Sequence, residues 1–416
     1  MRWRRCGRKS AVADARRAPD RIEHLLPAGL VPEPVELTIV VPALNEALTV
    51  GEFVDWCHEG IRRAGVSAQI LIVDSSTDET PDIVLARGGE VLRVPKRGLG
   101  RAYIDAIPFI RGKWIVMGDA DLTYDFRELD KFVDEFRRGA EFVMGSRFRG
   151  SIEDGAMPAL HRYFGTPLTT WILNRIYKSR YSDIHCGMRG LTREALLKID
   201  LRSQSWEYAS EMVLKAARLH LKLAEVPVKF YKDREGRISH HRRAGWLSPW
   251  IAGWINLRAM LIYSPDSFLM KPGILLLVLG LALALPLGLA GPLTIGRIGF
   301  NLHWMLLGMT SATLGYSCIQ IAVIARVMHG LRPGLDTWLA RHLTYNRGVW
   351  LAIVLAAIGT LLDGVLAWTW IQRDLALTSV SYPAILGLML ILAGFQTFGF
   401  TLLLEMSKRL VEQRGA

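Results

Sequence analysis

Four long apolar segments near the C-terminus limit what this chain can fold into. They cover residues 272–292, 304–325, 349–371 and 382–404. An α-helix needs about 20 apolar residues to cross the hydrocarbon core of a bilayer. A helix also satisfies its own backbone hydrogen bonds, which lipid cannot do. The sequence therefore predicts a four-span α-helical membrane domain over residues 269–406, followed by a tail at 407–416.

The positive charges between these segments predict their orientation. Arginines gather between the second and third segments, and more cations follow the fourth, whereas the other two connections carry little charge. These cations are Arg326, Arg332, Arg341, Arg347, Lys408, Arg409 and Arg414. Because cytoplasmic loops are enriched in Lys and Arg, we expect both termini and the N-terminal domain to be cytoplasmic. The expected location is the plasma (inner) membrane.

Composition argues against two other classes of protein. Half of the residues are hydrophobic, yet the net charge is +12, which favours a membrane protein with basic cytoplasmic surfaces over a nucleic-acid-binding protein. Cys6, Cys57, Cys186 and Cys318 lack the paired spacing of a zinc site or a disulfide framework. Asp363 is the one charge inside the apolar segments. We expect it to form a hydrogen bond in a packed helix–helix contact, because a charge exposed to lipid is costly.

The residues before the membrane segments predict an α/β domain over residues 35–235. Runs rich in β-branched residues end in polar turns and alternate with helical stretches. The expected strands lie at 37–42, 69–74, 90–94, 113–118, 140–147 and 224–230. This alternation predicts a mostly parallel, Rossmann-like sheet with helices on both faces.

Other stretches have the composition of membrane-surface segments. Residues 158–177 and 246–263 combine aromatic residues with arginine, which is typical of helices that lie in the bilayer interface. We expect residues 236–268 to form an interfacial segment. Residues 1–34 are basic and interrupted by proline, and we expect a disordered tail that can rest on anionic headgroups.

Two carboxylates, Asp119 and Asp121, end the strand expected at 113–118. Ligands of α/β sheets bind at the carboxyl ends of the strands, and Mg²⁺ typically takes one or two carboxylates together with substrate phosphates. The D-x-D spacing therefore favours a site for a metal ion and a diphosphate. The motif alone fits a solvated turn equally well, because Asp is common in turns. A glycine-bearing basic loop at 96–101 has amides and cations that suit phosphates.

Four motifs, taken together, resemble those of family 2 glycosyltransferases. They are Val-Val-Pro42-Ala-Leu-Asn45-Glu46, Ile-Val-Asp74, Gly-Asp119-Ala-Asp121-Leu and Gly-Ser-Arg147. Their order and spacing, over about residues 37–265, are most similar to those of dolichol- or polyprenyl-phosphate mannosyl- and glucosyltransferases. Membrane helices follow the catalytic domain in that group too. The resemblance implies a GT-A fold that uses a nucleotide-activated sugar.

The resemblance also implies roles for individual residues. The nucleoside would be contacted by Pro42, Asn45, Glu46, Asp74 and Asp119. Asp119 and Asp121 would hold Mg²⁺ or Mn²⁺. The acceptor phosphate would be faced by Arg147, Arg162 and Thr166, and the donor diphosphate by Arg234. The implied catalytic residues are Asp119, Asp121, Arg147 and Arg234.

Two positions depart from the family pattern. A glutamine, which supplies another metal ligand, often follows the D-x-D by two residues, and here Thr123 stands there. The usual Asp-Asp-Gly-Ser turn is Asp-Ser-Ser-Thr, so the second nucleoside-side carboxylate is absent or is replaced by Asp78. These departures affect the expected metal ligands rather than the class of enzyme.

The expected reaction is inverting, metal-dependent transfer of a hexose from GDP-mannose or UDP-glucose to a polyprenyl or dolichyl phosphate. The second pKa of a phosphate monoester is near 6, so the acceptor is already mostly anionic at neutral pH and needs no general base. The chemistry that remains is electrostatic: a cation on the diphosphate and arginines that orient two anionic substrates. The expected partners are the donor, the acceptor and the bilayer, without nucleic acid.

Two other functions compete with this hypothesis. A processive membrane polysaccharide synthase would carry a Gln-x-x-Arg-Trp motif, which this sequence lacks. A non-catalytic membrane scaffold with a degenerate transferase domain would not need Asp119 and Asp121, although Thr123 keeps this alternative open. The sequence does not distinguish between sugars, nucleotides, lipid lengths or oligomeric states.

Overall fold

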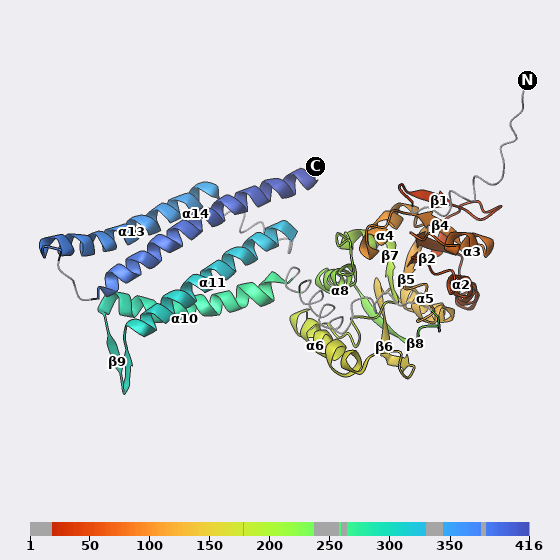
Figure 1. Ribbon diagram of the computed structural model, residues 1–416, viewed down its shortest axis with the longest axis horizontal. Coiled ribbons are helices and arrows are strands. Elements are labelled where there is room, and N and C mark those ends of the chain that lie inside the picture. The colour runs from red at the N-terminus through yellow and green to blue at the C-terminus, as the bar shows by residue number, and fades with distance from the viewer. Residues whose placement is uncertain are drawn as a thin grey trace, which may run out of the picture. The chain divides into compact units, whose positions relative to one another are not determined.

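The computed structural model describes residues 19–177, 179–236, 258, 264–329, 344–375 and 380–415. These residues form two compact units, which divide between residues 260 and 261. The first unit is an α/β fold and the second consists mainly of long helices (Figure 1). The second interfacial helix expected at 246–263 and most of the interfacial segment at 236–268 lie outside the described residues.

An eight-stranded sheet with the order β1-β4-β3-β2-β5-β7-β6-β8 forms the centre of the first unit. Its strands are β1 (Glu23–Leu25), β2 (Val35–Ala43), β3 (Ala68–Asp74), β4 (Glu90–Arg93), β5 (Gly112–Met117), β6 (Phe142–Ile152), β7 (Arg189–Thr192) and β8 (Leu223–Phe230). Strands β4, β3, β2 and β5 are parallel, and so are β6 and β8, whereas β7 runs antiparallel between β5 and β6. The mostly parallel sheet of the prediction is confirmed.

Helices cover both faces of this sheet (Figure 1). They are α2 (Val50–Ala64), α3 (Thr80–Ala86), α4 (Leu99–Ala106), α5 (Leu129–Arg137), α6 (Thr166–Tyr177), α7 (Arg193–Ile199) and α8 (Tyr208–Arg218). Helix α2 contacts α3 and α5, and α8 contacts α4, α6 and α7. Central strands enclosed in this way are apolar on both sides, as residues 70–73 of β3 show by being buried throughout.

Helix α2 illustrates how the sequence positions an element. Its buried residues Val50, Phe53, Val54 and Cys57 recur at helical spacing and form one apolar face. The helix ends at Gly65, whose φ of 60° is left-handed and costs glycine little. Helix α2 therefore runs back across the sheet and delivers the chain to β3, beside the strand from which it started.

The expected disorder of residues 1–34 is wrong for its second half, because β1 pairs antiparallel with β4. The pairing is reinforced by Glu90, which is 2 % exposed. The carboxylate of Glu90 accepts hydrogen bonds from Arg111, at 2.5 and 2.9 Å, and from Gln69, and it contacts the ring of His24 at 3.0 Å. A three-residue strand has too little periodicity to be recognised in the sequence. Its partners lie more than sixty residues away.

The strand order reverses between β2 and β5, and this reversal determines where a ligand can bind. From β2 the chain adds β3 and then β4 on one side, and it returns to add β5 on the other side of β2. The loops that follow β2 and β5 therefore leave the sheet in opposite directions. In open α/β sheets a crevice forms outside the carboxyl ends of the two strands at such a point.

The second unit contains four helices that are long and apolar enough to cross a membrane. They are α10 (Lys271–Ala290), α11 (Leu302–His329), α13 (Tyr345–Gln372) and α14 (Tyr382–Gly415). The four predicted spans are confirmed, but the helices extend beyond them. Helix α14 continues through the residues expected to form a tail, because the segment after Leu404 is rich in good helix formers and contains a Glu405–Arg409 pair one turn apart.

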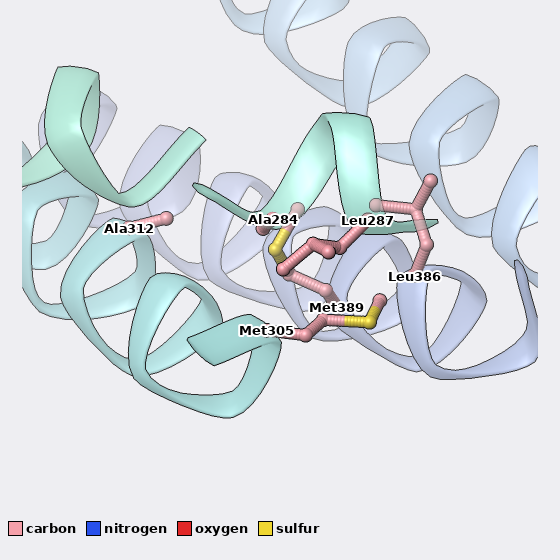
Figure 2. Packing of buried hydrophobic residues seen from close by; sticks show 6 residues of the cluster. All are labelled: Ala284, Leu287, Met305, Ala312, Leu386 and Met389. Carbon is pink, nitrogen blue, oxygen red and sulfur yellow. The ribbon is translucent and has the colours of Figure 1, made fainter. Parts of the chain in front are cut away.

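Close contacts between small residues hold these helices together. A Cβ on Gly280 of α10 would lie 2.3 Å from the backbone nitrogen of Ala312 in α11, and a Cβ on Gly359 of α13 would lie 2.5 Å from the carbonyl oxygen of Gly387 in α14. Such distances exclude any larger residue. Figure 2 shows the buried cluster that links α10, α11 and α14. Its members are Ala284, Leu287, Met305, Ala312, Leu386 and Met389.

Asp363 packs between helices as expected, but without the expected hydrogen bond. A Cβ on Gly387 would lie 2.8 Å from Asp363 Oδ1, so the carboxyl group faces α14. Within the described part of the chain, no hydrogen-bond partner reaches it. The glycine that lets the two helices approach offers no side-chain donor.

Candidate active site

The predicted nucleotide and metal residues meet at one edge of the sheet. Asn45 and Glu46 follow β2, Asp74 ends β3, and Asp119 and Asp121 follow β5. Pairing is parallel on both sides of β2, with Pro42 opposite Val73 and Val40 opposite Met117. Carboxyl ends of parallel neighbours lie at the same edge, so these side chains gather at the reversal of strand order, where open α/β sheets bind ligands.

Asn45 connects the loops that follow β2 and β3. Its φ of 57° is left-handed, a conformation that Asn tolerates better than most residues. The backbone N–H of Asn45 donates a hydrogen bond to Ser76 Oγ at 2.7 Å. The side-chain oxygen of Asn45 accepts a hydrogen bond from the backbone N–H of Thr77 at 2.9 Å. The side chain predicted to contact the nucleoside is therefore also what fixes the shape of the loop.

Glu46 and Asp74 are both buried at this edge. Glu46 is 6 % exposed, and its carboxylate accepts a hydrogen bond from Thr49 Oγ1 at 3.2 Å. Asp74 is fully buried and pairs with Arg93 of β4 at 2.8 Å. Burial raises the pKa of Asp74, and Arg93 counteracts this only in part. The nucleoside contact of Asp74 stays a prediction, because its carboxylate faces the neighbouring strand.

Asp78 takes a position near Glu46, as the departure from the usual turn suggested. Its carboxylate accepts hydrogen bonds from the N–H of Ala47 at 3.3 Å and from the N–H of Thr80 at 3.0 Å. It thus joins the end of the β2 loop to the start of α3.

The D-x-D turn adopts a costly backbone conformation. Leu122 has a φ of 63°, a left-handed value that is unusual for a bulky residue and costs about 1–2 kcal/mol. Asp121 Oδ1 accepts hydrogen bonds from the N–H of Thr123 at 3.1 Å and from its hydroxyl at 2.6 Å. Thr123, which replaces the usual glutamine, therefore orients the second carboxylate of the motif. Strained residues of this kind concentrate at functional sites.

Asp119 lies against a compact group of buried tyrosines. A Cβ on Gly187 would lie 2.7 Å from Asp119 Oδ2 and 2.9 Å from the ring of Tyr124, so glycine is required there. The Tyr124 hydroxyl accepts a hydrogen bond from the backbone N–H of Gly187 at 2.8 Å. The Tyr103 hydroxyl donates a hydrogen bond to the carbonyl oxygen of Gly118 at 3.1 Å. Burial raises the pKa of both tyrosines, so they stay neutral and contribute only hydrogen bonds.

The donor set of the D-x-D fits a hard divalent cation that binds together with substrate phosphates. Asp119 and Asp121 are both partly exposed, and both supply oxygen ligands. No cluster of three or more metal-ligating side chains occurs among the described residues. Any metal bound here would therefore need phosphate or water oxygens to complete its coordination, as Mg²⁺ commonly does.

Arg147, predicted to face the acceptor phosphate, is buried and paired. Its Nε and Nη2 donate to Asp183 at 2.7 and 2.9 Å, which is the bidentate arrangement of arginine and carboxylate. Burial acts to raise the pKa of Asp183, but the charge and hydrogen bonds of Arg147 outweigh it and hold this pKa below its ordinary value. Two of the three guanidinium nitrogens are thus already engaged, and acceptor binding by Arg147 stays a prediction.

The loop that carries Asp183 also anchors α6. His185 Nε2 lies 2.8 Å from Thr169 Oγ1, and the N–H of His185 donates to Asp183 Oδ1 at 3.2 Å. Burial lowers the pKa of His185 to about 4, so the ring is neutral at physiological pH. Thr166 and Thr170 of α6 are buried, so neither hydroxyl is open to solvent.

The remaining predicted cations lie in different surroundings. Arg162 is partly exposed in a π-helical turn, His161–Gly165, and lies over the ring of Tyr163. Arg234 pairs with Glu52 of α2 at 2.5 Å. In the basic loop, Arg97 and Arg101 both pair with Asp105. The substrate contacts of Arg162 and Arg234 remain predictions.

Comparisons with known proteins agree with this arrangement. Residues 38–200 match the model of glycosyl transferase family 2, and residues 321–408 match the family 2 C-terminal transmembrane region. The chain is 33% identical over 373 residues to the low-salt glycan biosynthesis hexosyltransferase Agl6 of Haloferax volcanii, covering 88% of each protein. The chain belongs to glycosyltransferase family 2.

Two more similarities each cover about half of this family 2 glycosyltransferase. It is 28% identical over 204 residues to the dolichyl-phosphate hexose transferase of Haloferax volcanii, covering 48% of this chain and 85% of that protein. The crystal structure of mannosyl-3-phosphoglycerate synthase from Rubrobacter xylanophilus matches 54% of this chain and 74% of that chain, with 24% identity and a TM-score of 0.42. The GT-A fold class, the glycosyltransferase class and the integral membrane character of the prediction are confirmed.

Sequence reasoning missed the residues that support the motifs. Asp183 lies in a polar loop outside the four motifs, and the tyrosines around Asp119 belong to none of them. Asp183 is 36 residues from Arg147 in the chain and Tyr103 is 15 residues from Gly118, and buried tyrosines resemble ordinary core residues in a sequence. Asp183 lies two residues before His185, in a loop whose density of polar residues was the available indication.

We predict that Asp183→Asn destabilises the protein by about 3–5 kcal/mol at neutral pH, because it leaves the buried Arg147 without a carboxylate. The pKa of Asp183 is depressed in the folded state, so its stabilising contribution is present above the ordinary Asp range near 4 and is lost as the pH falls below it. Unfolding temperatures of wild type and variant, measured from pH 7 to pH 3, should therefore converge at the acidic end.

A surface pair provides the control. Asp55→Asn removes the partner of Arg87 on an exposed part of the fold and should change stability by less than about 1 kcal/mol. A gap between wild type and Asp183→Asn that stayed constant with pH would contradict the electrostatic origin of the effect.

Proposed function

We propose that this glycosyltransferase transfers a hexose from a nucleotide sugar, GDP-mannose or UDP-glucose, to a polyprenyl or dolichyl phosphate with inversion at the anomeric carbon. The observation that carries the proposal is the pair of partly exposed carboxylates, Asp119 and Asp121, at the reversal of strand order in a chain that also has four membrane helices. A donor diphosphate suits the first feature, and a lipid acceptor suits the second.

On the donor side, Asp119 and Asp121 would hold Mg²⁺ or Mn²⁺. Such an ion neutralises negative charge on the leaving diphosphate. The chain itself holds the two carboxylates in place: Thr123 orients Asp121, and the Gly187–Tyr124 contact confines Asp119. The loops fixed by Asn45 and Asp78 would receive the nucleoside, because they border the same edge of the sheet.

On the acceptor side, α6 presents an inverted surface that suits a bilayer. Its threonines Thr166 and Thr170 are buried against the domain, whereas several large apolar residues of α6 and of residues 160–165 before it are exposed. The exposed residues are Leu160, Tyr163, Phe164, Leu168 and Trp171. Tyr163 is 74 % exposed and Trp171 is 64 % exposed. An apolar face of this size with flanking arginines is typical of a helix that lies in the membrane interface.

Arg162 is the arginine best suited to meet a lipid phosphate. It lies within this apolar surface, beside Tyr163. No carboxylate pairs with it in the part of the chain that the structure describes. Arg147, in contrast, already has Asp183 as a bidentate partner. We therefore favour Arg162 for the headgroup and assign Arg147 chiefly to holding the Asp183 loop.

The proposal is tested directly by incubating purified protein with a short polyprenyl phosphate and a panel of nucleotide sugars, followed by mass spectrometry of the lipid. We expect one sugar to be transferred, and transfer to stop in EDTA. Asp121→Asn keeps the shape of the side chain but removes its charge, and it should lower kcat by on the order of 10²–10³. Transfer that is insensitive to EDTA and to Asp121→Asn would contradict the metal site. Nucleotide-sugar hydrolysis without a lipid product would contradict the acceptor.

Arg162→Ala should raise the KM for polyprenyl phosphate by roughly tenfold, the loss of about one charge-assisted hydrogen bond, and leave donor affinity unchanged. Arg162→Lys should restore activity only in part, since lysine lacks the bidentate fork. Arg175→Ala removes an exposed cation from the same helix and is the matched control. Donor binding by calorimetry and kinetics in acceptor distinguish the two substrates. Weakened donor binding in Arg162→Ala would reverse the assignment.

We further propose that both termini and the α/β unit are cytoplasmic, in the plasma (inner) membrane. The arginines after α11 and the cations of α14 support this orientation, because basic segments are retained in the cytoplasm. In a variant without native cysteines, Ile298→Cys should react with an impermeant thiol reagent in intact cells, whereas Ala340→Cys and Leu410→Cys should not. Labelling at 340 or 410 from outside would overturn the orientation.

A further inference from the structure

Arg189 is a buried cation without a carboxylate partner. It begins β7 and is 1 % exposed. Its Nη2 donates to Cys186 O at 2.6 Å and its Nη1 to Ala209 O at 2.9 Å, while Nε has no hydrogen-bond partner. No carboxylate pairs with it among the described residues.

The other buried arginines of the described chain show how unusual this is. Arg93 pairs with Asp74, Arg147 with Asp183 and Arg326 with Asp266. Each is more exposed than Arg189. Burying a charge without a partner costs several kcal/mol. The most buried of these arginines therefore also has the largest uncompensated desolvation cost. Two carbonyl oxygens offset this cost in part, but a neutral donor could satisfy them equally well.

A closed ring of contacts places Arg189 next to Asp119. In one direction Arg189 donates to Cys186 O, and the next residue, Gly187, packs against the Asp119 carboxylate. In the other direction its guanidinium lies 5.8 Å from the centroid of the Tyr208 ring, which lies 4.9 Å from that of Tyr103. The Tyr103 hydroxyl then donates to Gly118, the residue before Asp119.

The sheet register agrees with this placement. Arg189 lies opposite Met117 of β5, two residues before Asp119. The charges of Arg189 and Asp119 also act on the same two hydroxyl groups. Burial raises the pKa of Tyr103 and of Tyr208, and on both tyrosines Asp119 adds to the shift while Arg189 opposes it. The cation therefore lies beneath the D-x-D, on the side of the sheet covered by α4 and α8.

We propose that Arg189 is a positioning residue of the donor site, whose fixed positive charge beneath Asp119 strengthens binding of the diphosphate group of a nucleotide donor. The inference rests on the proposed function, because it requires a nucleotide at the D-x-D. A divalent cation and the two carboxylates Asp119 and Asp121 sum to zero charge. The incoming diphosphate then lacks a counter-charge, and Arg189 supplies one through a dry interior in which charges interact more strongly than in water.

The alternative is a structural clamp, in which Arg189 only ties the Cys186 loop to the start of α8. Three substitutions separate charge from hydrogen bonding. Arg189→Lys keeps the charge, Arg189→Gln keeps a donor without the charge, and Arg189→Met removes both. The measurement is the calorimetric affinity of the full-length protein for UDP and for GDP, each with Mg²⁺ and in EDTA, together with the unfolding temperature.

We expect the lysine variant to bind the preferred nucleotide within about threefold of wild type and the two neutral variants to bind it roughly tenfold or more weakly. Arg111→Gln is the control: it removes a carboxylate-paired arginine at the opposite edge of the sheet and should lower the unfolding temperature without changing nucleotide affinity. Neutral variants that bind as wild type does, or a lysine variant as weak as the glutamine variant, would overturn the proposal.

A second pair of variants keeps the test decisive if the neutral substitutions prevent folding. Tyr208→Glu places a carboxylate beside the native Arg189, and Tyr208→Gln is its uncharged counterpart. The glutamate variant should bind nucleotide more weakly than the glutamine variant, and equal affinities would contradict a role for the charge. If wild type binds nucleotide but makes no lipid product, the proposed acceptor is wrong and the inference on Arg189 stands. If wild type binds neither UDP nor GDP, the proposed function and the inference on Arg189 are both contradicted.

Discussion

The parallel pairing of β2 with β5 is the constraint on which the candidate site depends. Its register fixes how far each strand extends and therefore where the loops at 43–50 and 118–123 leave the sheet. Neither loop is held by the strands alone. Asn45 and Ser76 fasten the first loop, and the Asp121–Thr123 hydrogen bonds fasten the second, each beside a residue in the left-handed region. Carboxylates borne by such loops keep their spacing before any substrate binds.

The sequence allowed six of the eight strands of the sheet, the membrane helices and the D-x-D to be predicted, because these depend on local patterns. Hydrophobic runs such as residues 113–118 fix a strand regardless of its neighbours. Contacts between residues far apart in the chain cannot be predicted from such local patterns. Nothing near Arg147 shows that Asp183 satisfies it, and nothing in residues 19–34 shows that β1 joins the edge of a sheet through His24 and Glu90. Arginines that the resemblance assigned to substrates are partly engaged within the protein, as Arg147 and Arg234 are.

Helix α6 links an exposed apolar surface of the domain to its interior. Its polar face contacts the His185 loop, which in turn carries Asp183 and packs against Asp119 through Gly187. A helix that buries its threonines and exposes its aromatic residues reverses the usual pattern of a soluble domain. This reversal is consistent with the long apolar helices in the same chain, because both features suit an apolar environment.

The glycine contacts between α10 and α11 have a consequence for the route of any long-chain lipid. At Gly280 and Gly315 the two backbones approach so closely that even one added methyl group would collide with main-chain atoms of the other helix. An isoprenoid chain is far wider than a methyl group. It cannot pass between α10 and α11 at these glycines unless the two helices separate. The seam between α10 and α11 is therefore closed to a long-chain lipid.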